Sequence, residues 1–259
     1  MAVPFDPGTL SEVLAWYQVE LATITSTRVT TLPDTKGGAS FTTNVSAPGP
    51  VQSDSANGLK VMTFTGAEAL AAVDNNAAWR NSEFFGLAFW FKATAETGQG
   101  TFFSYWSGTL GMSANRVLVG TSANTRVRQI VRNAADSGSS TLDTATGAGH
   151  FVIKTGVWQF FAFLVDGRVA AADRNRVKLS GADMPLPQFP TVTGSVDATL
   201  RTSLAAPNLV ALGCADVDQA TSAVAGGIVG QMGPDIVFFD PAMKIGKLRR
   251  IMGYRVPRG

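Results

Sequence analysis

Cysteine and histidine are almost absent from this chain of 259 residues, which contains one of each, Cys214 and His150. A lone cysteine excludes a disulfide within the chain. A cysteine nucleophile needs a base such as histidine, and the one histidine lies in a glycine-rich stretch. Cys214 ends the apolar run Leu-Val-Ala-Leu-Gly-Cys, so we expect a small buried residue there.

Long apolar runs are absent as well. No stretch approaches the ~20 apolar residues that a membrane-spanning helix requires. Residues 1–7 contain no basic group and no apolar run of the length found in a signal peptide. We therefore expect no membrane insertion, and synthesis in the cytoplasm without a signal peptide.

Charged residues are scarce, at 15% of the chain, whereas 45% of the residues are hydrophobic. This balance favours a folded core over disorder. The 21 basic and 19 acidic residues leave a net charge of +2, so no overall field points to nucleic acid. The tail after Asp240 is the one asymmetry, since it has basic residues and no acid. We expect it to dock on an acidic surface or on phosphate, or else to be a solvated helix face. Its basic residues are Lys244, Lys247, Arg249, Arg250, Arg255 and Arg258.

An aromatic stretch at 154–167, KTGVWQFFAFLVDG, is the most informative part of the chain. A short aromatic run with turn signals at both ends predicts a buried strand. Both of its faces are apolar: the even positions of 158–164 form one face and the odd positions of 161–165 form the other. A sheet with one solvated face would not need this pattern. We therefore expect a central strand with one face in the core and the other under a loop or in a groove.

A second aromatic strand is predicted over 84–92, where Phe85, Leu87, Phe89 and Phe91 share one large apolar face. Further alternating runs follow at hairpin spacing, including a bulged strand over 227–240, and a helix is predicted over 241–252. About a dozen strands and one short terminal helix predict an all-β jelly-roll sandwich.

Six segments, taken in order, resemble the concanavalin A-like lectin/glucanase superfamily in its laminin-G-like form. The resemblance implies an antiparallel two-sheet jelly roll in a single domain over 1–259. Its core would cover about 57–243, with N-terminal strands in 1–56 packed on it and a helix and basic tail at 241–259. The flanks resemble those of such domains in bacteriophage and bacterial surface proteins. The segments are KVMTFTG (60–66), FFGLAFWFKA (84–93), TFFSYWS (101–107), GVWQFFAFLVDGR (156–168), NLVALGC (208–214) and GGIVGQMGPDIVFFDPAM (226–243).

Catalysis is not expected. Enzymes of this superfamily use two glutamates on one strand, because glycoside hydrolysis needs two carboxyl groups across the scissile bond. No glutamate here lies two residues from another carboxylate. Asp216 and Asp218 have strand spacing, but they lie in a polar stretch that is typical of a loop.

Calcium is the common ligand of this superfamily and would need several Asp or Asn oxygens on loops. Asp166, Asp173, Asp216 and Asp218 are the candidates. Asp166 before Gly167 is also a usual turn residue, and Asp216 and Asp218 suit a solvated loop. We predict no cofactor and leave calcium open.

Sugar binding would use exposed aromatic rings with Asn and Arg beside them. The candidates are Trp79 with Arg80 and Asn81, together with Trp90 and Tyr105. The alternative is that these large aromatic residues fill the core.

We therefore predict a non-catalytic protein on the exterior of a phage or phage-like particle. Its partners would be cell-surface polysaccharide or neighbouring virion subunits, within an oligomeric assembly. The first alternative is a carbohydrate-binding, lectin-like module at the bacterial surface. The second is a glycoside hydrolase with a displaced carboxylate pair.

Overall fold

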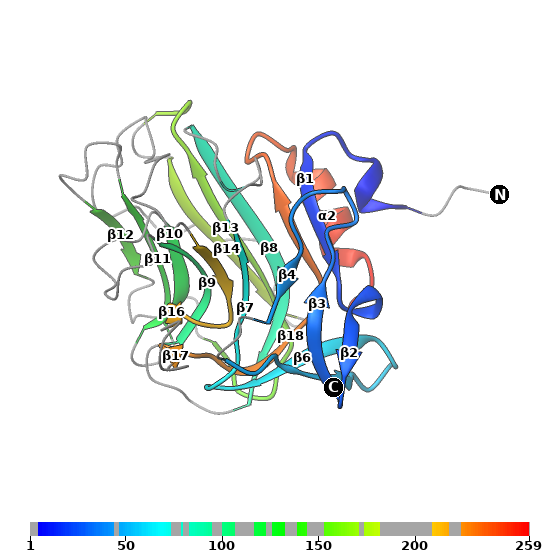
Figure 1. Ribbon diagram of the computed structural model, residues 1–259. Helices are drawn as coiled ribbons and strands as arrows, with labels where there is room; N and C mark the ends of the chain where they lie inside the picture. Colours follow the sequence, from blue (N-terminus) through cyan, green and yellow to red (C-terminus); the bar gives the residue numbers. More distant parts are fainter. Residues whose placement is uncertain are drawn as a thin grey trace.

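The protein is predominantly antiparallel β-sheet in the computed structural model (Figure 1). The helix α2 (Ile245–Gly253) and the short 3-10 turns η1 (Pro7–Thr9) and η2 (Val19–Leu21) accompany the strands. The structure describes residues 5–43, 47–73, 79, 83–94, 100–106, 117–122, 126–132, 139–143, 153–170, 174–181, 209–217 and 224–258.

The described strands range from two to eleven residues in length. They are β1 (Val13–Gln18), β2 (Thr23–Thr25), β3 (Arg28–Leu32), β4 (Phe41–Thr42), β5 (Val51–Asp54), β6 (Lys60–Thr65), β7 (Leu70–Val73), β8 (Phe84–Ala93), β9 (Gly100–Trp106), β10 (Val117–Ser122), β11 (Arg126–Arg132), β12 (Ser139–Asp143), β13 (Gln159–Asp166), β14 (Asn175–Gly181), β15 (Leu209–Leu212), β16 (Asp216–Val217), β17 (Val224–Ala225) and β18 (Val229–Phe239).

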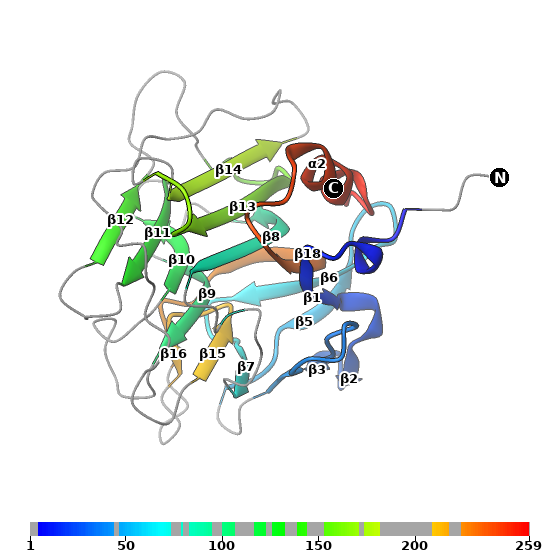
Figure 2. The ribbon, with the colours of Figure 1, turned by 90° about the horizontal axis from the view of Figure 1, so that it is seen from above.

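Strand pairing does not divide these strands into the two separate sheets that the sequence suggested. Among the strands that the structure describes, sixteen form one sheet, in the order β12-β11-β10-β9-β15-β7-β4-β3-β5-β6-β18-β8-β13-β14, with β1 on β18 and β2 on β3, and β16 pairs with β17 apart from it. The sheet curls round its core (Figures 1 and 2). The link is β5, because it pairs with β3 through Arg28 and Val51 and with β6 along its length. The all-β prediction is confirmed, and the two-sheet description is corrected.

The central strand β13 lies between β8 and β14, and every one of its residues is buried. Its two faces enter two different clusters, as the alternation predicted. The inner face, with Phe161 and Phe163, belongs to the large core inside the curled sheet. The outer face, with Phe160 and Leu164, belongs to a second cluster on the other side of the sheet. The prediction of a central strand with one face in the core is confirmed, whereas the other face lies under α2 and the chain ends and not under a loop or in a groove.

The cover of the outer face is α2 together with the two ends of the chain (Figure 2). Leu248 and Ile251 of α2 pack on this second cluster, and Phe5 and Tyr254 lie at its margin. The helix begins later than predicted, because 241–243 form a turn that starts after β18. The predicted bulge in β18 is confirmed by a register shift between Met232 and Ile236.

Replacing Phe161 with alanine should lower the free energy of unfolding by about 3–5 kcal/mol, because the ring is fully buried and stacks on Phe89 and Phe163. The exposed Arg249 is the control, and Arg249→Ala should change stability by less than about 0.5 kcal/mol. Urea unfolding of both variants measures the difference. Equal stabilities would contradict the assignment of the core.

Candidate functional site

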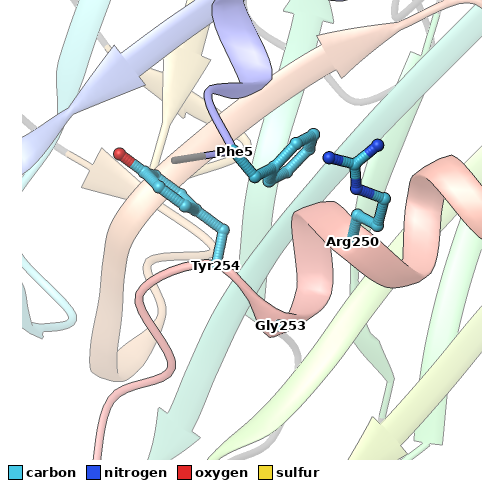
Figure 3. Close-up of a pocket in the computed structure, with 4 residues that line it drawn as sticks. All are labelled: Phe5, Arg250, Gly253 and Tyr254. Carbon is cyan, nitrogen blue, oxygen red and sulfur yellow. The ribbon is translucent and has the colours of Figure 1, made fainter. Parts of the chain in front are cut away.

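A pocket of about 420 Å³ opens where the N-terminal segment meets the end of α2 (Figure 3). Its lining residues are Phe5, Arg250, Gly253 and Tyr254. Figure 3 shows the Phe5 ring between the Tyr254 ring and the Arg250 guanidinium. The Cζ atom of Arg250 lies 4.2 Å from the centroid of Phe5, and the Phe5 and Tyr254 rings meet edge to face with centroids 6.0 Å apart. The pocket therefore combines an aromatic wall with a cation.

The amphipathic pattern of α2 places Arg250 at this pocket. Leu248 and Ile251 face the sheet, so the positions between them turn outward. Arg250 lies in the last helical turn, where a cation interacts favourably with the helix dipole. Tyr254 follows as the C-cap, and its backbone N–H donates to the carbonyl of Ile251. The end of the helix thus fixes both a charged and an aromatic wall.

Gly253 lies in the lining of the pocket. A Cβ atom added there would have no neighbouring heavy atom within 4 Å, so local packing does not explain the glycine. Glycine in a helix is less favourable than alanine by about 1 kcal/mol. Gly246 is equally uncrowded, but it lies outside the pocket lining. The two positions offer a matched pair for testing the pocket.

Among the residues that the structure describes, Arg250 makes no ion pair. Other members of the predicted docking tail are neutralised within the molecule: Lys247 pairs with Glu12, and Arg255 pairs with Glu20 and Asp235. The Lys247 contact holds the pKa of Glu12 below its ordinary value. Arg249 and Arg258 are exposed, and the backbone of Arg258 bonds to residues 56 and 57. The docking role of this tail stays a prediction. The basic side chains of α2 that make no ion pair in the described structure are Arg249 and Arg250.

A buried carboxylate lies on the far side of the Tyr254 ring. Asp235 of β18 is 8% exposed, and its Oδ1 accepts a hydrogen bond from Trp16 Nε1 at 2.9 Å. The Trp16 ring packs edge-on against Tyr254. Burial raises the pKa of Asp235 to about 6, although Arg255 Nη1, at 3.7 Å from Oδ1, opposes the rise. Burial also raises the pKa of Tyr254, and the charge of Asp235 adds to this effect.

The aromatic residues predicted to bind sugar lie inside the molecule. Trp79, Trp90 and Tyr105 are 0%, 6% and 1% exposed, so they present no ring face to a ligand in this structure. The ring of Trp79 packs on Phe41 and Phe238. Its neighbours in the sequence are polar, but the ring itself enters the core. All three rings fill the interior, as the alternative interpretation of the sequence had it. Arg80 and Asn81 lie outside the described residues.

The candidate calcium ligands are not brought together in the described part of the chain. Asp166 is buried in a turn, where it pairs with Arg168 and accepts from the backbone N–H of that residue. Asp216 lies in β16, and Asp173 and Asp218 fall outside the described residues. In the described ranges no three His, Cys, Asp or Glu side chains come close enough to hold a metal ion. Those ranges also contain no helix of the length and apolarity needed to cross a membrane.

No sequence pattern predicted a role for Phe5, Tyr254 or Asp235. Phe5 and Tyr254 meet only because both chain ends cover the same sheet face, which no local pattern encodes. A signal for Asp235 was present, since it is an acid inside the apolar segment GPDIVFF. A charge in a predicted buried strand indicates either a partner or a raised pKa.

Asp235→Asn should change how stability depends on pH. Because the pKa of Asp235 rises from 3.8 in the unfolded chain to about 6 in the fold, the fold binds this proton more tightly. Ionised Asp235 therefore destabilises the fold fully above pH 6, and this penalty disappears as the pH falls toward 4. Between pH 7.5 and 4.5 the wild type should gain about 2 kcal/mol relative to Asp235→Asn. Urea unfolding at both pH values measures this gain, and parallel pH profiles of the two proteins would contradict it.

Comparison with known proteins establishes the type of fold. No family model matches the sequence, and a search of curated proteins finds no match, so the laminin-G-like resemblance stays a prediction. The carbohydrate-binding module CBM40 of the Ruminococcus gnavus IT-sialidase, bound to α2,3 sialyllactose, aligns with a TM-score of 0.52 at 14% identity. The alignment covers 78% of this chain and 97% of the module.

Two botulinum neurotoxin domains also align with this chain over most of its length. The type G receptor-binding domain aligns with a TM-score of 0.54 at 12% identity, and the serotype D ligand-binding domain in complex with N-acetylneuraminic acid aligns with a TM-score of 0.51 at 12% identity. Each alignment covers 94% of this chain and 51% of the neurotoxin domain. At these identities the chain shares a fold with the three structures, and its own chemistry must be argued from its own residues.

Proposed function

We propose that this chain is a non-catalytic carbohydrate-binding domain whose binding site is the pocket of Phe5, Arg250, Gly253 and Tyr254. The observation that carries the proposal is the composition of this pocket. Two aromatic rings and a guanidinium that makes no ion pair in the described structure border an open cavity. Ligand sites commonly combine apolar walls with a few polar groups that fix orientation.

The chemistry of the pocket suits a sugar that carries a carboxylate. The C–H face of a sugar ring packs on aromatic side chains, which Phe5 and Tyr254 supply. Arg250 presents a planar fork of N–H donors that matches both oxygens of a carboxylate. Stacking on Phe5 restrains the Arg250 side chain, so less freedom is lost when a ligand binds.

Two of the solved structures that share the fold hold ligands of this class. The CBM40 module is bound to α2,3 sialyllactose, and the serotype D domain to N-acetylneuraminic acid. Both ligands contain a sialic acid, which is a sugar with a carboxylate. This agreement supports our choice of ligand class, whereas the position of the site rests on the pocket of this chain alone.

The wider role follows from the same proposal. We take 1–259 as one binding domain that attaches to polysaccharide without cleaving it. A jelly-roll classification, a position on the exterior of a phage-like particle and contacts with neighbouring subunits stay predictions of the sequence. The bacterial-surface module, which was the first alternative, agrees better with the named structures, since none of those is a virion protein.

Arg250→Met should weaken the binding of α2,3-sialyllactose by about tenfold to a hundredfold, because it removes the charge and keeps most of the side-chain length. Arg249→Met is the matched control on the same helix, outside the pocket lining, and should bind as the wild type does. Titration calorimetry with sialyllactose and with lactose, which lacks the carboxylate, measures both effects.

The glycine pair adds a second arm to the same test. Gly253→Leu should fill the pocket and abolish binding, whereas Gly246→Leu should bind normally, and neither should weaken the helix. Equal binding by both glycine variants would place the site elsewhere. A wild-type chain that binds neither charged nor neutral glycans in an array would refute the function.

A further inference from the structure

The segment after α2 is held in an unusual backbone conformation. Arg255 has a φ of 50°, in the left-handed region that non-glycine residues rarely adopt. The residue directly before it, Tyr254, is a wall of the proposed pocket. A conformation of this kind persists only when surrounding contacts impose it. The contacts that hold Arg255 therefore also position the pocket wall.

Two carboxylates from separate parts of the fold hold Arg255. Its side chain is 14% exposed, with Nη2 at 2.6 Å from Glu20 of η2 and Nη1 at 3.7 Å from Asp235 of β18. Glu20 is exposed, so its ion pair is weakened by water and salt. Asp235 is buried, so its charge acts on Arg255 with less screening. Arg255 thus has one exposed partner at hydrogen-bond distance and one buried partner at longer range.

Asp235 is also linked to Tyr254 through the side chain of Trp16. Its Oδ1 holds the indole of Trp16, and that ring packs against Tyr254 with centroids 5.9 Å apart. Its Oδ2 is buried and has no hydrogen-bond partner among the described residues. A buried anionic oxygen without a donor makes the ionised form of the carboxylate costly. Asp235 is thus linked to Tyr254 through Arg255, which follows Tyr254 in the chain, and through Trp16.

The groups around Asp235 determine when it ionises. Burial is the main cause that raises its pKa to about 6, and the charge of Glu20 adds to the rise. Arg255, the hydrogen bond from Trp16 and the nearby side chain of Gln18 lower the pKa. On the other side, Asp6, Glu20 and Arg255 act on the phenol of Tyr254 together with Asp235. These groups face Asp235 and Tyr254 from η2, β1 and both chain ends.

We propose that Asp235 and Arg255 form a proton-responsive latch that holds Tyr254 in place as a wall of the pocket. The proposal rests on the proposed function, in which this pocket binds the ligand. While Asp235 is ionised, it holds Arg255 and the chain from 254 to 258. When it takes up a proton, Arg255 keeps only its exposed partner Glu20, and the wall loosens. The domain would bind its glycan at neutral pH and release it in mild acid.

Hydrogen exchange of the full chain at pH 7.5 and 5.0 tests the latch without any ligand. The amides of Tyr254 and Ala56 donate to the carbonyls of Ile251 and Arg258, so they report on this segment. After correction for intrinsic exchange rates, their protection in the wild type should fall about tenfold at pH 5.0. In Asp235→Asn it should be low at both pH values.

Asp240→Asn is the matched control. Asp240 follows the same strand and pairs with Arg168, and this contact keeps the pKa of Asp240 below its ordinary value, so Asp240 does not take up a proton at pH 5.0. Its variant should keep the wild-type pH response. The latch is refuted if Asp235→Asn responds to pH as the wild type does, or if protection in the wild type does not change.

Binding of α2,3-sialyllactose separates this proposal from the proposed function. Affinity should fall several-fold from pH 7.5 to 5.0 in the wild type and stay constant in Asp235→Asn. A chain that binds no sugar yet shows the Asp235-dependent exchange would refute the function and support the latch. A chain that binds the sugar with the same pH response in both proteins would support the function and refute the latch.

Discussion

The structure depends on a sheet whose central strands are apolar on both faces. Phe161 and Phe163 of β13 require one core inside the curled sheet, and Phe160 and Leu164 require a second cover outside it. Burial of such side chains contributes about 1.5–3 kcal/mol each, so neither face can remain in water. The outer face is covered by α2 and the two chain ends. The candidate site exists because these covering elements meet at Phe5 and Tyr254.

The covering layer also explains the distribution of charge. Two cations of the C-terminal tail pair with acidic residues outside the tail, Lys247 with Glu12 and Arg255 with Glu20 and Asp235. Arg250 instead stacks on Phe5 and makes no ion pair with any described residue. One helix therefore serves both as a structural cover and as the source of a free cation. In our proposal, the buried Asp235 connects the covering layer to the binding pocket through Arg255, the residue that follows Tyr254.

Much of the fold could be predicted from local patterns. The period-two alternation in β13 and β8 assigned each aromatic residue to its face, and the proline and glycines of β18 indicated its bulge. The continuous sheet could not be predicted, because two of its junctions consist of one register pair each, Arg28 with Val51 and Thr42 with Ala71. The sequence left two positions open for Trp79, because its polar neighbours indicated the surface and its large ring suited the core, and in the structure the ring lies in the core. The basic tail included Arg250, but its pairing with Phe5 joins the two ends of the chain, which composition does not reveal.

A crystal structure of the protein with α2,3-sialyllactose tests the central claim most directly. The account predicts that the sialic acid lies in the pocket at the end of α2, with its carboxylate on the Arg250 guanidinium and its ring against Phe5. A sugar bound on any other surface, with this pocket empty, would contradict it.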